Sequence, residues 1–560
     1  MIETDVVVIG SGAAGLTAAL VAASEGLEVL LCEKSPLIGG TTARSAGTLW
    51  APGSPPIVRN GRDEPKEAVD SYLKHELGCH YRPQMVKAFL DAVPQAVAYL
   101  ENHSEVKFQQ VENPDYHSDA PGGSPFGRAI APLPFDGRLL GKDFDILRPP
   151  LDIHLVLGGM MVGRREVPML LRPFSSMLAL RSAFKILAQH AIARMRHRRG
   201  TRLLLGNALV ARFLVSLRRQ GVTIRTGSAL KNLVIEQGRV VGVELIESGR
   251  LVLVRVRKAV ILAAGGMAHD RELRARWMKE FPHEHSLVCE SNTGEAVLAA
   301  QRIGAAIDSD VASPAFWSPA SLFLAGSKQA VWIHGHMDRG KPGLMAVDSA
   351  GRRFVNESNS YHDFVTGQYG QKVDHVANRI PAYLVCDHRF IRNYGLGMVM
   401  PVYGRLESYV KKGYLVKART IRELAERISV ESDNLVSTVE TYNHDARRGC
   451  DTAFGRGGSA FNRFNGDADN QPNPCMRPLD QPPYYAVKVY PCSIGIALGL
   501  ATDLNGAVLD KNGARIPGLY ACGNDMTSVM RGCYPGPGIM LGPAVAFAYR
   551  AVMDIIGKPC

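Results

Sequence analysis

The sequence predicts an α/β protein of two domains, one of them inserted into the other. Its 560 residues exceed the length of one ordinary domain. Apolar residues make up 46% of the chain and charged residues 21%, so the chain can bury large cores. A strand–turn–helix–strand pattern opens the chain, and short strands of similar type begin near residues 258 and 516. If all these strands join one sheet, a second domain must interrupt the first.

The first 33 residues have the pattern of a nucleotide-binding turn. A short β-branched run over 5–9 predicts a buried strand, and a glycine-rich turn over 10–15 follows it at once. An Ala- and Leu-rich helix over 16–26 then leads into a second strand, which ends at Glu33. Gly10 would make the tight turn, Gly12 would let a pyrophosphate approach the helix N-terminus, and Gly15 would let helix and strand pack closely. Glu33 would accept a hydrogen bond from a ribose hydroxyl, so the order of elements predicts a Rossmann-like dinucleotide-binding domain.

Three further stretches favour FAD over a nicotinamide cofactor. The glycine-rich loop 39–47 comes soon after Glu33 and could reach the flavin end of a long cofactor. The strands 258–264 and 516–522 both enter glycines, far from the first turn. A cofactor domain assembled from distant stretches suits FAD, because a nicotinamide domain is normally contiguous.

The same stretches predict the domain boundaries. We expect a FAD-binding domain over 1–282 plus 482–560, with a basic, apolar insertion at 156–219. Residues 283–481 would form an inserted α+β catalytic or cap domain, which ends in the turn-rich run 455–483. The active site is expected between the two domains, where ligand pockets tend to form.

With these motifs, the chain resembles the fumarate reductase and succinate dehydrogenase flavoprotein superfamily over essentially its full length. The resemblance implies an adenine contact by the backbone near Leu233 and flavin contacts at Asn524, Gly538 and Leu541. Some members hold the flavin covalently through a histidine in the loop corresponding to 39–47, and this loop has none, so we expect non-covalent FAD. The full set of residues expected to bind FAD is Gly10, Ser11, Gly12, Ala13, Ala14, Gly15, Glu33, Lys34, Gly40, Thr41, Thr42, Ser45, Ala46, Gly47, Leu233, Ala264, Gly265, Gly523, Asn524, Gly538 and Leu541.

The substrate is expected to be neutral and apolar. The superfamily's dicarboxylate enzymes carry a His-Thr pair before the last flavin motif, and the corresponding stretch 491–500 holds neither histidine nor arginine. Cations are what hold carboxylates in such sites. This disfavours a carboxylate-handling reductase, which remains the alternative within the superfamily.

Within the superfamily, the stretch 523–543 is similar to the signature of FAD-dependent 3-ketosteroid dehydrogenases, where a tyrosine precedes a Gly-Pro-Gly turn. That tyrosine is Tyr534, and the turn contains Gly538. Two further matches place Tyr361 after an Asn-Glu segment and Tyr116 in a loop before 121–123.

The resemblance implies a role for each of these residues in the desaturation of a ketone. The Tyr534 hydroxyl and the Gly538 amide would bind the ketone oxygen, as in an oxyanion hole. Tyr361 would take the α-proton, with help from Tyr116, and flavin N5 would take the hydride. Phenols have a pKa near 10, so Tyr361 needs help from its surroundings to act as a base.

Several alternatives stay open at this stage. Δ1 desaturation of a 3-ketosteroid is the default, but Δ4-(5α) desaturation and smaller cyclic ketones such as cyclohexanone also fit the motif. A flavin-binding interaction protein without activity is the non-enzymatic alternative. The electron acceptor is not encoded in a motif, and a quinone is a candidate.

The formal charge of +12 belongs to one segment. Residues 164–219 hold thirteen Lys and Arg and one acid, so the rest of the chain is balanced. The segment predicts a solvated basic face, a peripheral contact with an anionic membrane or an acidic partner protein. No nucleic-acid motif accompanies it. No C-x-x-C motif, signal peptide or membrane span is present, so we expect no metal site and a cytoplasmic protein.

Overall fold

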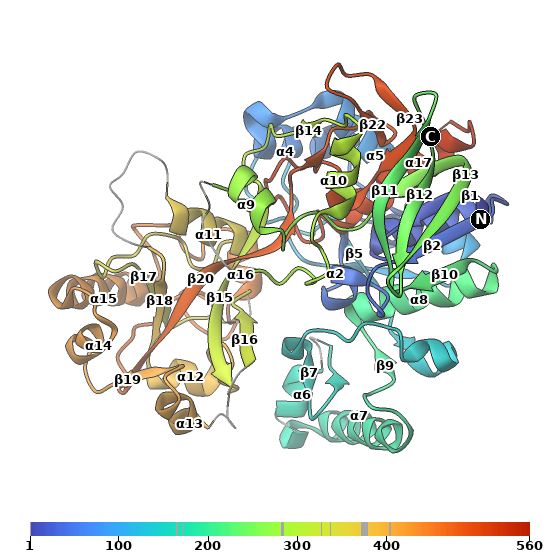
Figure 1. The fold of residues 1–560 in the computed structure, drawn as a ribbon. Coiled ribbons are helices and arrows are strands. Elements are labelled where there is room, and N and C mark those ends of the chain that lie inside the picture. The colour runs from blue at the N-terminus through green and yellow to red at the C-terminus, as the bar shows by residue number, and fades with distance from the viewer. Residues whose placement is uncertain are drawn as a thin grey trace.

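The computed structural model describes residues 2–163, 166–171, 173–279, 281, 285–325, 328–335, 338–370, 379–401 and 405–559. Its first sheet has five parallel strands in the order β10–β2–β1–β13–β23. The bounds are β1 Ile2–Ile9, β2 Val29–Glu33, β10 Thr223–Thr226, β13 Arg250–Leu262 and β23 Arg515–Ala521. These strands come from three distant parts of the chain and lie side by side (Figure 1). The predicted strand–turn–helix–strand order is present in β1, α1 and β2. The β-branched run Val6–Val8 of β1 is fully buried, as expected for a strand inside a parallel sheet.

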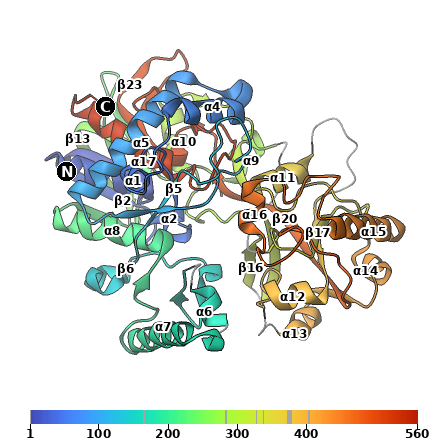
Figure 2. The ribbon, with the colours of Figure 1, turned by 180° about the vertical axis from the view of Figure 1, so that it is seen from behind.

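Helices α1 Ala13–Ser24 and α17 Leu541–Ile555 pack on this sheet, and α5 Pro83–His103 and α8 Leu205–Arg219 pack against these helices, on the side that Figure 2 brings forward. Helix α1 contacts both α8 and α17, and ten of its residues from Ala13 to Ala22 are buried. That burial explains its uniformly apolar sequence. The antiparallel strands β11 Ser228–Glu236 and β12 Arg239–Glu247 extend the sheet, and β22 Ala507–Leu509 pairs with β23.

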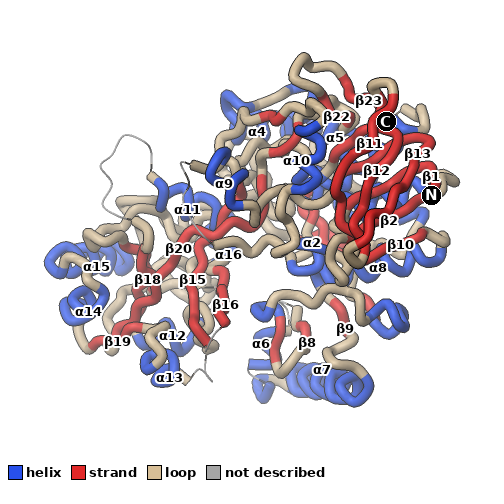
Figure 3. Tube along the Cα trace, viewed as in Figure 1, coloured by secondary structure: helices blue, strands red, loops and turns tan. Residues whose placement is uncertain are grey.

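A second, antiparallel sheet has the order β16–β15–β20–β18–β17, with β19 also paired to β20 (Figure 3). Its strands are β15 Ala315–Ala325, β16 Lys328–Ile333, β17 Leu344–Val347, β18 Ala382–Cys386, β19 Val416–Ala418 and β20 Tyr484–Ile496. The helices around it are α11 Tyr361–Tyr369, α12 His388–Tyr394, α13 Leu406–Lys411, α14 Ile421–Ile428, α15 Ser432–Arg448 and α16 Ala460–Asn465. The overall mixed α/β character is as the sequence predicts.

Of the two expected domain boundaries, the structure describes only the one at residue 482. Strand β20 lies on the C-terminal side of the expected boundary at 482, yet its hydrogen-bond partners are β15, β18 and β19 of the second sheet. Strand β20 is mostly buried and lies between β15 and β18, in the middle of the second sheet. The other expected boundary, at 282–283, lies outside the described residues.

The basic insertion 156–219 divides into two parts. Helix α8, its second half, is almost entirely buried between α1 and α2 Gly40–Arg44 and belongs to the first domain. The first half forms a separate layer of β7 Leu155–Val156, β8 Met160–Met161, α6 Val167–Leu171 and α7 Met177–Arg196 (Figure 1). Strand β9 Arg202–Leu203 connects the two and pairs with β6 Phe135–Asp136. Among the described residues, no helix is long and apolar enough to cross a membrane.

Candidate active site

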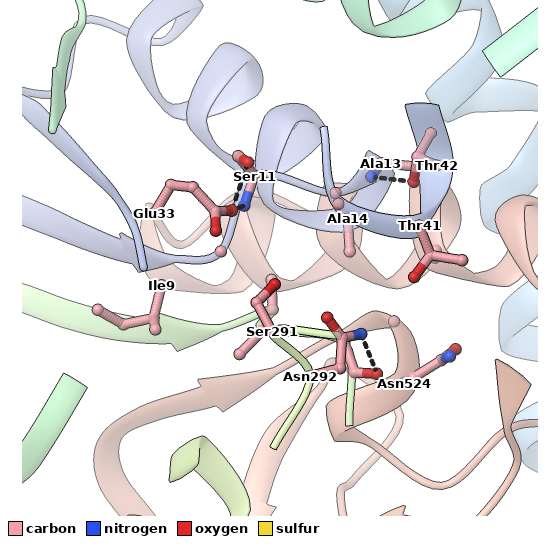
Figure 4. Close-up of a pocket in the computed structure, with 18 of the residues that line it drawn as sticks. Ile9, Ser11, Ala13, Ala14, Glu33, Thr41, Thr42, Ser291, Asn292 and Asn524 are labelled. Atoms are coloured by element: carbon pink, nitrogen blue, oxygen red, sulfur yellow. Dashed lines mark hydrogen bonds between the residues drawn. The ribbon is translucent and has the colours of Figure 1, made fainter. Parts of the chain in front are cut away.

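A cleft at the carboxyl ends of β1, β2 and β13 encloses about 970 Å³ of unfilled space, part of it open to solvent. Cofactor sites of parallel sheets form at such an edge. Figure 4 shows that residues from distant stretches of the chain, such as Glu33, Asn292 and Asn524, converge on it. The predicted residues that line it are Gly10, Ser11, Gly12, Ala13, Ala14, Glu33, Lys34, Gly40, Thr41, Thr42, Ser45, Ala264, Gly265, Gly523, Asn524 and Leu541.

The glycine turn is shaped by close backbone contacts. Gly10 has φ of +105°, and a Cβ there would lie 2.3 Å from the Ala263 carbonyl oxygen at the end of β13. A Cβ on Gly15 would lie 1.9 Å from the Gly10 oxygen, so α1 could not pack against the turn. Gly12 differs, because its Cβ would meet only Thr42 Oγ1, at 3.6 Å. Gly10 and Gly15 therefore allow the turn to pack closely against β13 and α1. Gly12 leaves the N-terminus of α1 open to a ligand.

Two side chains shape the rim of the cleft near α1. Glu33, 6% exposed, accepts hydrogen bonds from the Ser11 amide at 3.1 Å and the Ser11 hydroxyl at 2.5 Å. Its other oxygen accepts from the Ser35 amide at 2.8 Å. Thr42 Oγ1 accepts from the Ala13 amide at 2.9 Å, so helix α2 contacts the first turn of α1 (Figure 4). An acid fixed at the end of β2 is well placed for a ribose hydroxyl.

Five predicted residues do not line the cleft: Gly15, Ala46, Gly47, Leu233 and Gly538. Gly47 has φ of +67° and packs on α8, where a Cβ would lie 2.6 Å from the Gly206 nitrogen. On β11 the cleft reaches Ser228 and Leu230 instead of Leu233. Ser228 and Leu230 are two positions apart, so they lie on the same face of β11.

The sequence analysis missed a further group of lining residues: Ile9, Cys32, Ser228, Leu230, Ala263, Ser291, Asn292, Glu295, Ile494, Met540 and Ala544. Asn292 donates to the Gly265 carbonyl oxygen at 2.9 Å, and Lys34 pairs with Glu295 at 2.9 Å. The turn over 292–296 is the one signal that could have suggested this contact. The lining is a glycine cradle with backbone amides, two acids and one cation, which fits an elongated dinucleotide such as FAD.

The three predicted tyrosines lie together. Tyr116 donates to the Tyr361 hydroxyl at 2.8 Å, and Tyr361 donates to the Tyr534 hydroxyl at 2.7 Å. The ring centroids of Tyr116 and Tyr534 are 5.4 Å apart and stacked, and Tyr361 lies edge-on to both. Tyr116 and Tyr534 are each 4% exposed, and Tyr361 is half-buried.

Each tyrosine is positioned by its own local structure. Tyr361 is the first residue of α11, whose N-cap Ser360 accepts from the Asp363 amide at 3.1 Å. The Tyr116 amide donates to the Pro535 carbonyl oxygen at 2.9 Å, which joins its loop to the Tyr534 stretch. The Tyr72 hydroxyl donates to the same oxygen at 2.6 Å. Burial raises the pKa of all three tyrosine hydroxyls well above the usual value, so they are protonated at neutral pH.

Gly538 follows Tyr534 in the turn before α17. Its carbonyl oxygen accepts from the Trp50 amide at 3.0 Å, and a Cβ there would lie 2.6 Å from the backbone of residues 48–50. No acceptor for the Gly538 amide occurs within the described part of the chain. This amide is therefore available to a ligand.

A charged group behind the tyrosines was missed by the sequence analysis. His117 lies between Glu76, 2.6 Å from its Nδ1, and Asp363, 3.0 Å from its Nε2. Burial lowers the pKa of His117, but both carboxylates outweigh this and raise it to about 11. The His117 charge also holds the pKa of Asp363 below its usual value, against the effect of burial. His117 thus joins the Tyr116 loop to the first turn of α11. Next to Tyr361, His362 is kept neutral, because burial lowers its pKa to about 4.

Two other aromatic residues, Tyr394 and Trp317, make hydrogen bonds within the second domain. Tyr394 donates its hydroxyl to Asp467 in the second domain. Trp317 is 1% exposed and donates through its indole nitrogen to Ser313 at 2.8 Å. Both are parts of the second domain's interior.

The cleft and the parallel sheet define a flavin-binding oxidoreductase, and comparison with known proteins gives the same answer. The model of the FAD-binding domain family matches residues 5–541. A 3-oxosteroid 1-dehydrogenase of Mycobacterium tuberculosis is 36% identical, over 99% of this chain and 98% of its own. A 4-oxocyclohex-2-ene-1-carboxylate 5-dehydrogenase of Sinomonas cyclohexanicum is also 36% identical, over 99% and 94%.

A solved structure is similar over its whole length. The 3-ketosteroid Δ1-dehydrogenase of Sterolibacterium denitrificans, in complex with 1,4-androstadiene-3,17-dione, superposes with a TM-score of 0.91 and 31% identity, covering 100% of both chains. The chain belongs to the FAD-binding domain family and, within it, to the 3-ketosteroid dehydrogenases. It is a flavoprotein oxidoreductase with FAD as its cofactor, as the sequence predicts.

Proposed function

We propose that this enzyme desaturates a neutral cyclic ketone between its α and β carbons, with a 3-ketosteroid as substrate and Δ1 as the new bond. The observation that carries this proposal is the chain of three hydroxyls from Tyr116 through Tyr361 to Tyr534, at 2.8 and 2.7 Å. The Tyr534 stretch continues directly into Met540 and Leu541, which line the cleft. The names of the relatives support the same reaction. In this proposal the parallel-sheet domain is the Rossmann-like FAD domain, FAD is held non-covalently, and the second domain covers the substrate.

Tyr534 and Gly538 would hold the ketone oxygen. In the structure Tyr361 donates to Tyr534, which leaves the proton of Tyr534 free to donate to the substrate. Once Tyr361 has taken the α-proton it can donate in this way again, and a donor that itself accepts a hydrogen bond is polarised and donates more strongly. Together with the Gly538 amide it would stabilise the negative charge that develops on the oxygen as the α-proton leaves, by about 3 kcal/mol per donor.

Tyr361 would take that proton. Proton removal breaks the α C–H bond and leaves its electron pair in the enolate, which then forms the new double bond as hydride leaves the β carbon. FAD, when bound, supplies the acceptor for that hydride. The Tyr361 phenolate would be stabilised by the hydroxyl of Tyr116, 2.8 Å away. Stacking with Tyr534 and the 2.9 Å bond to Pro535 keep Tyr116 in place.

The stretch 491–500, which corresponds to the carboxylate-binding stretch of the superfamily's dicarboxylate enzymes, holds neither histidine nor arginine, and this supports a neutral substrate. A smaller cyclic ketone, which need not be neutral, is the second candidate, because one relative at 36% identity is named for a 4-oxocyclohex-2-ene-1-carboxylate.

Anaerobic mixing of the yellow holoenzyme with a ketone panel tests the proposal. 4-Androstene-3,17-dione is expected to bleach the flavin absorbance and to yield the 1,4-diene, identified by NMR. Faster bleaching by 4-oxocyclohexanecarboxylate would favour the smaller ketone. No bleaching by any ketone, with reoxidation of the reduced enzyme by fumarate, would refute both.

A further inference from the structure

Asp115 is a buried carboxylate beside Tyr116, and its exposed fraction is 0%. Its Oδ1 accepts a hydrogen bond from the Trp50 indole nitrogen at 2.9 Å, and its Oδ2 accepts from the Arg128 guanidinium at 2.7 Å. The Ser124 amide also donates to Oδ2, at 3.2 Å. A buried carboxylate is stable only when partners of this kind replace water. The three donors therefore hold the Asp115 side chain in one position.

Two paired strands bring the main partners of Asp115 together. Trp50 ends β3 Leu49–Trp50, and Arg128 directly precedes β5 Ala129–Pro132. These strands pair with each other in antiparallel fashion, and the Trp50 side chain is 0% exposed. The indole nitrogen and the guanidinium thus reach the same carboxylate from neighbouring strands.

Arg128 helps to keep this carboxylate charged. Burial raises the pKa of Asp115 to about 6, while Arg128 and the Trp50 hydrogen bond act in the opposite direction, so Asp115 is ionised above neutral pH. The Trp50 indole therefore donates to a charged acceptor, which makes a strong hydrogen bond. Arg128 is 3% exposed and also pairs with Glu64 at 2.6 Å, so it would keep one carboxylate partner without the Asp115 charge.

The turn that carries Gly538 contacts Trp50 closely. The Trp50 amide donates to the Gly538 carbonyl oxygen at 3.0 Å. A Cβ on Gly536 would lie 2.7 Å from the Trp50 indole nitrogen and 3.0 Å from Asp115 Oδ1. A Cβ on Gly542 would lie 2.1 Å from the Trp50 carbonyl oxygen. The turn therefore packs on the Trp50 backbone and also on the hydrogen bond between its side chain and Asp115.

The loop that carries Tyr116 is joined to the same turn. Tyr116 follows Asp115 in the chain, and its amide donates to the Pro535 carbonyl oxygen at 2.9 Å. The hydroxyl of the fully buried Tyr72 donates to that oxygen as well, at 2.6 Å. Asp115 is thus connected to two parts of the proposed site, the Tyr116 loop and the glycine turn.

We propose that the hydrogen bond between Asp115 and Trp50 holds the glycine turn and the Tyr116 loop at the spacing that the reaction needs. Both side chains act through their neighbours, so they are positioning residues. The inference rests on the function proposed above, in which the Gly538 amide binds the ketone oxygen and Tyr116 assists Tyr361. Donors stabilise a developing charge only from hydrogen-bond distance, and a misplacement of about 1 Å can cost about 10²-fold in rate.

Trp50→Phe tests the proposal, because phenylalanine keeps an aromatic ring and removes the indole donor. The FAD-loaded variant should lose about 10- to 100-fold in kcat with 4-androstene-3,17-dione and an artificial electron acceptor. KM should change by less than about twofold, because the contact with the ketone oxygen is strongest in the transition state. Flavin absorbance and the circular dichroism spectrum show whether the variant is folded and loaded.

Trp317→Phe is the matched control for the loss of a buried indole hydrogen bond. Trp317 is 1% exposed and donates through its indole nitrogen to Ser313 at 2.8 Å, within the second domain. Its replacement should lower the melting temperature as Trp50→Phe does, and it should keep the native kcat. An equal loss of kcat in both variants would show that stability alone accounts for the effect.

Asp115→Asn and Asp115→Ala form a second test that leaves Trp50 in place. Both remove the negative charge, and Arg128 keeps Glu64 as a partner in both. Asparagine still offers an oxygen to the indole nitrogen, whereas alanine offers none. The asparagine variant should therefore lose less kcat than the alanine variant. A role limited to balancing the Arg128 charge predicts equal losses, and this test decides the question even if Trp50→Phe does not fold.

A double-mutant cycle with Tyr534→Phe shows whether Trp50 acts on the ketone-binding groups. Residues that act as a unit have non-additive effects on kcat. The loss in the double variant should therefore be smaller than the product of the two single losses. Independent effects would multiply.

Four results would overturn the inference: native kcat in Trp50→Phe, equal losses in Trp50→Phe and Trp317→Phe, equal losses in the two Asp115 variants, or losses that multiply in the cycle. A failure of the proposed function looks different. In that case Tyr534→Phe alone would keep its turnover, or no ketone would bleach the native flavin.

Discussion

The hydroxyl of Tyr361 donates to the hydroxyl of Tyr534 at 2.7 Å, although 173 positions separate the two residues in the chain. One begins helix α11 of the second domain, and the other lies in the loop before α17 of the first. The hydrogen bond therefore joins the two domains. A change in either hydroxyl should affect turnover without affecting the cofactor.

Replacing Tyr534 by phenylalanine removes the proposed donor to the ketone oxygen. The variant should keep its FAD and lose about 10²–10³-fold in kcat, as expected for one oxyanion donor. Turnover of 4-androstene-3,17-dione with an artificial electron acceptor measures the loss, and the flavin spectrum measures occupancy. Tyr394→Phe is the matched control, since the Tyr394 hydroxyl binds Asp467 in the second domain. Full activity of the Tyr534 variant would remove its role.

Turnover should rise with pH. Burial raises the pKa of Tyr361 well above 10, so the ionised form that would act as a base is scarce at neutral pH and increases about tenfold per pH unit. The kcat/KM of the native enzyme is expected to follow this slope on the alkaline side. Tyr361→Phe should be slow and lack the slope. A native profile that is flat from neutral to alkaline pH would argue against a tyrosine base.

Gly12→Ala should separate cofactor binding from folding. Gly12 has φ of −74°, which alanine adopts readily, and the added Cβ would meet only Thr42 Oγ1 at 3.6 Å. The apoprotein should keep its circular dichroism spectrum, but FAD should bind more weakly because the methyl group occupies the approach to the α1 N-terminus. Titration of apoprotein with FAD measures this. Gly335→Ala, where a Cβ meets nothing within 4 Å, should bind FAD as the native chain does.

His117→Gln should remove a pH-dependent part of the stability. Burial works against the His117 charge, but Asp363 and Glu76 raise its pKa from 6.5 to about 11 in the folded state. A raised pKa contributes fully below the unfolded value, and the contribution falls as pH rises through the folded value. The free energy of unfolding of the native protein should therefore exceed that of the variant by more at pH 6 than at pH 10. Equal differences at both pH values would show that the His117 charge does not stabilise the fold.

The turn 10–15 is a feature whose structure the local sequence largely predicts. The close approach of Gly15 to the Gly10 oxygen lies within one strand–turn–helix unit, so the local residues predict it, whereas the space around Gly10 is limited by Ala263 of the distant strand β13. Leu233 shows the limit. A contact near Leu233 was expected from the resemblance alone, but the cleft is lined by Ser228 and Leu230, which lie two positions apart on one face of β11.

The sequence by itself determined the α/β class, the FAD cofactor and the family, because these depend on short motifs whose residues are close together in the chain. Only the tertiary structure decided that β20 belongs to the second sheet, and that His117 lies between Glu76 and Asp363. It also showed that Arg218 and Arg219 of α8 are ion-paired, whereas the cations of α7 are exposed. Ion pairs and strand pairs such as these join residues far apart in the sequence. Their formation depends on which surfaces packing brings together, and no local pattern encodes that.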